Sequence, residues 1–179
     1  MDADTTFLVL KAKQGDSAAF SKLYEFYASD MQRFALYMLK NSHDAEDAVQ
    51  EAAVSAWKNI KNLRDDALFK AWIFKILSNK CKSMLASGGK NPDALNFKEA
   101  EFLLSDTDDG FSFKSCELKE ALLKLTPPDG QIVLLSIIGG FKSDELARIY
   151  NMPPGTVRSK QKRALEKLRE ALGEEANPG

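Results

Sequence analysis

Apolar residues recur every three or four positions along most of the chain, and this spacing restricts it to a helical fold. Three such stripes occupy residues 20–38, 48–60 and 69–84. Residues at this spacing share one face of an α-helix, so each stripe predicts a helix with one buried face. No alternating pattern typical of a β-strand stands out. We therefore predict that the chain is all-α up to about residue 86.

Residues 87–115 interrupt the helical pattern. The pair Gly88-Gly89 is a strong turn signal, and the segment as a whole holds three basic and six acidic residues. A loop of about 25–30 residues is long for the interior of a compact domain. We therefore predict a flexible acidic linker here, with room for a helical turn near residues 97–104.

Beyond the linker, helical spacing returns in shorter segments. A short helix over Ser143–Tyr150, a tight turn and a longer helix over Thr156–Leu172 form a helix-turn-helix pattern. The predicted architecture is thus all-α, with two small helical domains at residues 1–86 and 116–179, the second a helix-turn-helix. Short polar side chains that can accept backbone N–H bonds are predicted as helix N-caps, namely Asp16, Asp44, Ser143 and Thr156.

The formal net charge of −1 conceals a strongly basic last helix. Residues 158–169 hold six basic residues and one acidic residue, which indicates either a solvated helix face or a nucleic-acid contact. The start of the second helix enters the major groove in helix-turn-helix proteins. The outward stripe there, predicted to contact bases, comprises Arg158, Ser159, Lys162 and Arg163. The residues predicted to contact backbone phosphates are Lys160, Lys167 and Arg169.

Several classes of protein are disfavoured by the composition. No run approaches the roughly 18 apolar residues that span a bilayer, and the N-terminus lacks a secretory signal, so we expect a cytoplasmic protein without membrane insertion. The two cysteines, Cys81 and Cys116, are far apart, and His43 is the only histidine, so we expect no disulfide, metal or other cofactor. The sequence shows no phosphate-binding glycine loop and no nucleophile with its base, so we do not expect an enzyme.

Several motifs together resemble a known family. The C-terminal motifs at residues 118–127, 131–135, 143–150 and 155–169 resemble region 4 of sigma-70-type factors, most closely the extracytoplasmic-function group, group 4. In the first domain, three segments resemble region 2 of the same family, namely residues 44–52, 56–60 and 69–79. The motifs occur in the order of the family, which makes the resemblance more specific than any one of them.

The resemblance implies a docking site and a promoter-opening element in the first domain. The residues matching the acidic helix that docks on the polymerase clamp are Asp44, Glu46, Asp47, Gln50 and Glu51. From the residues alone, the carboxylates among them are explained as well by helix capping and dipole chemistry. The residues implied at the −10 promoter element are Arg64, Lys70, Lys75, Asn79, Lys80 and Lys82, with Asn79 the best candidate for a base contact. The aromatic residues of this domain that we assign to the core rather than to base stacking are Trp57, Phe69 and Trp72.

Two features depart from the family pattern. Gln161 stands where the family usually has an apolar residue, so its turn either packs differently or faces solvent. After Asn79 the family often shows an aspartate and an arginine cluster, which residues 80–89 lack.

The resemblance implies a sigma factor that directs core RNA polymerase to promoter DNA and assists melting, with an anti-sigma protein as a further partner. Its isolated DNA affinity should be weak, because each domain offers few phosphate contacts. Two alternatives stay open: a stand-alone helix-turn-helix regulator, and a sigma-like decoy that titrates an anti-sigma protein.

Overall fold

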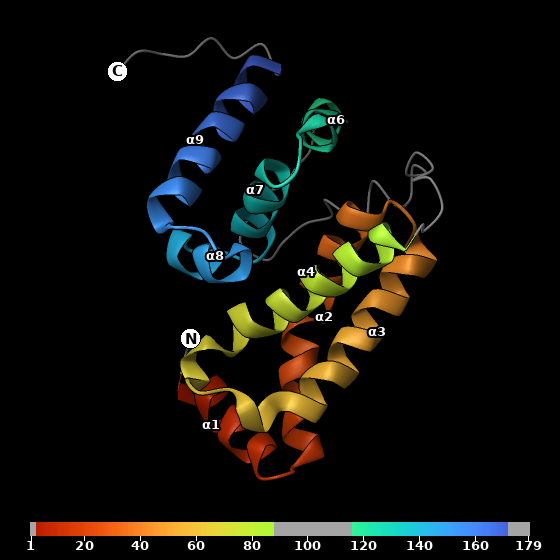
Figure 1. Cartoon of the computed structure of the whole chain (residues 1–179), viewed down its shortest axis with the longest axis vertical. Helices are drawn as coiled ribbons and strands as arrows, with labels where there is room; N and C mark the ends of the chain where they lie inside the picture. The colour runs from red at the N-terminus through yellow and green to blue at the C-terminus, as the bar shows by residue number, and fades with distance from the viewer. Residues whose placement is uncertain (1–2, 88–115, 172–179) are drawn as a thin grey trace. The chain divides into compact units, whose positions relative to one another are not determined.

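The helical spacing of the sequence is realised throughout the described part of the chain, residues 3–87 and 116–171 of a computed structural model (Figure 1). Helices are the only regular structure in these ranges, and none of them is long and apolar enough to cross a membrane. The chain divides into two compact units, Met1–Ala94 and Leu95–Gly179, which we describe separately. The prediction of an all-α fold with two helical domains is confirmed, whereas the predicted helical turn at residues 97–104 lies outside the described residues.

The first unit is built on a long helix, α2, which packs against α1, α3 and α4 (Figure 1). Its core contains an aromatic pair: Phe34 and Phe74 meet edge to face, with ring centroids 6.2 Å apart. Phe69 is fully buried as predicted, but Trp57 and Trp72 are only half-buried. The elements of this unit are α1 (Ala3–Lys13), α2 (Ser17–Leu39), α3 (Ser42–Asn59), η1 (Ile60–Asn62), η2 (Asp66–Leu68) and α4 (Phe69–Ala86).

Helix starts in the first unit follow one predicted cap and contradict another. The Asp16 carboxylate accepts the backbone N–H of Ala19, so Asp16 is the N-cap of α2 as predicted. The predicted cap Asp44 is wrong. Asn41 caps α3 instead, and its side-chain oxygen accepts the N–H of Asp44 at 2.9 Å. The carboxylate of Asp44 is thereby left for other contacts in the first turn.

The second unit surrounds a buried apolar helix, α7, which ends at Ile138, directly before the pair Gly139-Gly140. Helix α9 packs against α6, α7 and α8. Leu146, Ala147 and Ile149 of α8 are buried. The elements of this unit are α6 (Cys116–Lys124), α7 (Asp129–Ile138), α8 (Ser143–Tyr150) and α9 (Pro154–Ala171).

The turn between α8 and α9 is fixed by Asn151, which adopts a left-handed backbone with φ 52°. The N–H of Met152 then donates to the carbonyl of Ala147 at 3.0 Å and closes the end of α8. Helix α9 begins immediately afterwards, with Pro154 in its first position, where a missing N–H costs nothing. The α8–turn–α9 pair is the predicted helix-turn-helix.

Both predicted caps of the helix-turn-helix are wrong. Lys142, not Ser143, precedes the first turn of α8, and its backbone N–H donates to the carboxylate of Glu145 at 2.8 Å. Thr156 lies inside the first turn of α9, because Pro154 starts the helix two residues earlier. Leu165 of α9 is exposed, although Ala164 and Leu168 on the same helix are buried.

Candidate nucleic-acid interface

Helix α9 has one buried face and one charged face. Val157, Ala164 and Leu168 are buried against the rest of the second unit, at the spacing expected for one helix face. The opposite face carries the four residues predicted to contact bases, and all are exposed: Arg158, Ser159, Lys162 and Arg163. The structure therefore brings the predicted base-contacting residues together on one accessible stripe.

Local hydrogen bonds order part of this stripe. The hydroxyl of Ser159 donates to the carbonyl of Gly155 at 3.0 Å, and Arg163 Nε donates to the carbonyl of Ser159 at 3.3 Å. Lys162 lies 3.9 Å from Glu166, an exposed pair one helical turn apart. Such a pair contributes little in water. Lys162 can therefore exchange Glu166 for a phosphate or a base edge at small cost.

The three predicted phosphate contacts differ in availability. Lys167 and Arg169 are exposed on α9. Lys160 instead points toward α7, where its ammonium lies 3.1 Å from a carboxylate oxygen of Asp129. Both side chains of that pair are largely buried, at 22% and 15% exposure. Because the pair ties α9 to α7, the geometry gives Lys160 a structural role and disfavours it as a phosphate contact.

Gln161 lies on the packed side of α9 and not toward solvent. Its side-chain nitrogen donates to the hydroxyl of Ser136 on α7 at 3.0 Å, and that hydroxyl donates in turn to the carbonyl of Ile132 at 2.9 Å. A polar side chain can occupy this position because it has a partner inside the unit. The departure from the family pattern is thus compensated by a second polar residue on the neighbouring helix.

The predicted −10 residues of the first unit divide into two groups. Lys75, Asn79 and Lys82 are exposed and share one face of α4, which the half-buried Trp72 extends at the same spacing. Lys70 and Lys80 leave α4 in other directions, and Arg64 is exposed in the segment before η2. Only part of the predicted set therefore forms a single surface.

Lys80 joins the predicted −10 element to the predicted polymerase-binding helix. Its ammonium lies 2.8 Å from Glu51 Oε2 on α3, between residues 29 positions apart in the sequence. The two side chains edge an open hollow of about 450 Å³, lined otherwise by Gln50, Val54, Ser55, Lys58 and Asn59. Residues of the outer face of α3 and one residue of α4 therefore line the same hollow.

The predicted polymerase-binding residues lie along the outer side of α3. Glu46, Gln50 and Glu51 are exposed, whereas Asp44 and Asp47 are half-buried, and Asp47 lies 3.9 Å from His43. Val54 was not predicted as a site residue, but it is 53% exposed within this row. Its position off the buried stripe of α3 could have indicated this exposure from the sequence. In the described ranges no three His, Cys, Asp or Glu residues are grouped so as to hold a metal ion.

Comparison with known proteins decides the family. The family models for Sigma-70 region 2 and Sigma-70, region 4 match residues 23–90 and 117–168. The ECF RNA polymerase sigma-E factor of Escherichia coli is 29% identical over 187 residues, covering 96% of this chain and 93% of that protein. The chain belongs to the extracytoplasmic-function sigma factors of the sigma-70 family. In this sigma factor, region 4 contains the helix-turn-helix and region 2 contains α3 and α4.

Solved structures share the fold of this sigma factor. CnrH, solved in complex with the cytosolic domain of CnrY, is 22% identical and gives a TM-score of 0.74 over 97% of this chain and 99% of that chain. The sigma factor RpoE of Bartonella quintana, solved with the anti-sigma factor NepR, is 23% identical and gives 0.68 over 88% of this chain and 98% of that chain. Helix α1 precedes the residues that the region 2 model matches.

Proposed function

We propose that this sigma factor directs core RNA polymerase to a specific set of promoters through three surfaces: the exposed stripe of α9, the outer face of α4 and the outer face of α3. The observation that carries the proposal is the exposed basic stripe of α9 on a helix-turn-helix that lies in the matched region 4. A binding protein of this kind works by positioning the polymerase and stabilising melted DNA. It acts where polymerase and chromosome are, in the cytoplasm.

At the upstream element, α9 enters the major groove with its first turns. Arg158 and Arg163 can each donate two hydrogen bonds to guanine O6 and N7, which is a base-specific contact. Ser159 and Lys162 lie between them on the same stripe and can reach bases or phosphates. Lys167 and Arg169 supply charge further along the helix, which adds affinity without sequence information.

At the −10 element, the outer face of α4 holds the melted strand. The amide of Asn79 can both donate and accept hydrogen bonds, as the edge of an unpaired base requires. Lys75 and Lys82, three to four residues away on either side, suit the flanking phosphates. The half-buried Trp72 leaves part of its ring accessible at the end of this face, where a base can stack.

The outer face of α3 docks on the polymerase. Its exposed carboxylates are suited to arginines of a partner, and Val54 supplies an apolar contact within the same row. An anti-sigma protein is a second partner of this sigma factor, since two proteins of the same fold were solved with protein partners, and one of these complexes joins a sigma factor to an anti-sigma factor. A protein that covers these surfaces blocks both polymerase and promoter.

A binding assay with purified core RNA polymerase tests the docking surface. We expect the wild-type chain to co-purify with core enzyme, and the Asp47→Arg variant to bind about tenfold or more weakly, because the reversal places like charges together. Glu25→Arg, which reverses an exposed charge on α2, is the matched control and should bind like the wild type. Absence of a wild-type complex, or wild-type affinity for Asp47→Arg, would refute this assignment.

A further inference from the structure

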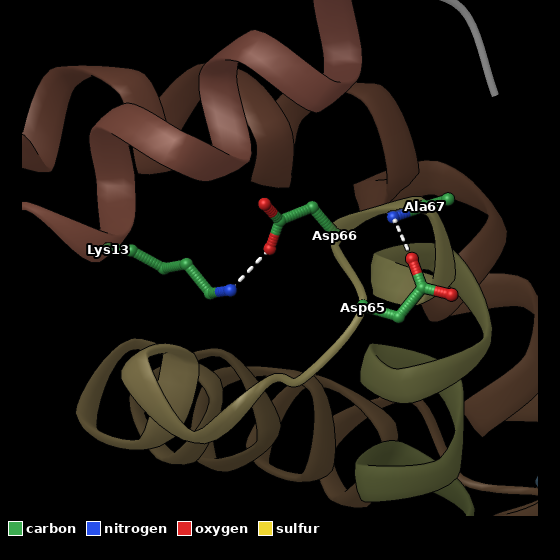
Figure 2. Close-up of polar contacts among 4 residues, drawn as sticks. All are labelled: Lys13, Asp65, Asp66 and Ala67. Atoms are coloured by element: carbon green, nitrogen blue, oxygen red, sulfur yellow. Dashed lines mark hydrogen bonds and ion pairs between the residues drawn. The ribbon is translucent and has the colours of Figure 1, made fainter.

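One ion pair joins α1 to the segment that connects α3 with α4. The ammonium of Lys13, the last residue of α1, contacts a carboxylate oxygen of Asp66, the first residue of η2 (Figure 2). The two residues are 53 positions apart in the sequence. Their side chains are only 22% and 17% exposed. Water screens a pair in this position less than the exposed Lys162–Glu166 pair of α9, so the contact restrains the segment more strongly.

The connecting segment is fixed at several further points. Helix α1 packs against both η1 and η2. The carboxylate of Asp65 accepts the N–H of Ala67 at 3.0 Å (Figure 2). The N–H of Leu68 donates to the Asp65 carbonyl at 3.0 Å. Leu63 is buried on one side of the segment and Phe69 on the other. Asp66 is therefore the polar attachment between two apolar ones.

These attachments hold an exposed surface in one conformation. Arg64, Asp65 and Ala67 remain exposed between the buried and paired positions. The segment leads directly into α4, whose outer face we assign to the −10 strand. A short exposed segment that is ordered before its ligand arrives loses less conformational entropy on binding and discriminates better between ligands.

We propose that Lys13 is a positioning residue for −10 recognition: it holds Asp66, and thereby the segment from Arg64 to Leu68, in the conformation that contacts the unpaired promoter strand. The proposal rests on the proposed function of α4 and adds a residue from α1. Lys13 lies outside residues 23–90, which the region 2 model matches, so the contact is a property of this chain that the family model does not contain.

The test compares variants in the complete holoenzyme, core RNA polymerase with the full chain. Lys13→Met removes the cation and keeps the apolar stem, Asp66→Asn removes the anion, and Lys13→Asp with Asp66→Lys restores a pair of reversed polarity. Lys22→Met removes an exposed cation from α2 of the same unit and is the control. Each holoenzyme transcribes promoters that carry every single base change in the −10 element, both as duplex and with the −10 region already unpaired.

We expect Lys13→Met and Asp66→Asn to lower duplex transcription about tenfold and to flatten the preference among −10 bases, while binding to core enzyme and the response to −35 changes are retained. The reversed pair should recover most of the preference. Wild-type base preference in Lys13→Met would overturn the proposal. The proposal would also be overturned if these variants lost preference among −35 bases to the same extent and unfolded at a lower temperature, since that result indicates general destabilisation. If the wild-type holoenzyme itself initiates at no promoter, the proposed function fails instead.

Discussion

Lys80 on α4 and Glu51 on α3 form an ion pair of 2.8 Å that connects two surfaces with different proposed partners. Lys80 belongs to the predicted −10 contacts, and Glu51 to the predicted polymerase contacts. Each charge therefore neutralises the other in the free chain. Polymerase docking that engages Glu51 would release Lys80 for DNA, so the pair contributes to the weak DNA affinity expected of the isolated protein.

Breaking this pair should move the two affinities in opposite directions. Glu51→Gln removes the carboxylate charge, so the isolated chain should bind a single-stranded −10 oligonucleotide about two- to fourfold more tightly, because an exposed pair contributes up to about 1 kcal/mol. Affinity for core enzyme should fall. Fluorescence anisotropy measures both affinities.

The control is Glu120→Gln, which removes the carboxylate of an exposed pair with Lys124 in the other unit. This variant should leave both affinities unchanged. If Glu51→Gln binds the oligonucleotide no better than the control does, the pair does not restrain Lys80.

The charged face of α9 should separate into two kinds of contact. Arg158→Ala and Arg163→Ala should each weaken binding to the cognate −35 element by about 1–3 kcal/mol and relax base preference at one position. Lys167→Ala should weaken binding to all sequences alike and reduce the salt slope by about one phosphate contact. Holoenzyme binding to −35 variants at several salt concentrations distinguishes these results. Unchanged preference in both arginine variants would contradict the assigned stripe.

The hydrogen bond from Gln161 to Ser136 should contribute to the stability of the second unit. Gln161→Ala removes it and should lower the free energy of unfolding by about 1 kcal/mol, the usual value for one such bond. Calorimetry of the full chain measures this loss. Gln14→Ala, an exposed glutamine in the first unit, is the control. If Gln161→Ala and Gln14→Ala have the same free energy of unfolding, the contact adds nothing to stability.

Burial raises the pKa of the Cys81 thiol from its ordinary 9.0 to about 12. Because only the thiolate attacks disulfide reagents, a Cys116→Ser chain should not react with Ellman's reagent at pH 8 while folded, and should react in urea. The thiol ionises near pH 9 in the unfolded chain but only near pH 12 in the folded chain. The free energy of unfolding should therefore be unaffected by this group below pH 9 and should fall as pH rises from about 9 toward 12. Rapid labelling of the folded chain would contradict the burial of Cys81.

The sequence predicted those features that depend on local periodicity. The buried stripe of α2 and the outward stripe from Arg158 to Arg163 follow from helical spacing alone. Helix starts were predicted less well, since several residues near each start can cap it. Asn41 displaces Asp44, and Pro154 starts α9 ahead of Thr156.

The contacts that a local pattern cannot encode were missed. Lys160 pairs with Asp129 across 31 positions, so a lysine on a basic helix has a structural partner. Lys80 likewise finds Glu51, and Lys13 finds Asp66, only after the helices pack. The side-chain types of the candidate site could therefore be listed from the sequence, but not which of them are already paired.

Transcription by purified core RNA polymerase with this protein, on genomic DNA and with all 5′ ends mapped, tests the central claim most directly. The account predicts discrete start sites that core enzyme alone does not use, each preceded by the same pair of −35 and −10 sequences. Absence of new start sites, although the protein binds core enzyme, would contradict it and would favour a decoy that titrates an anti-sigma protein.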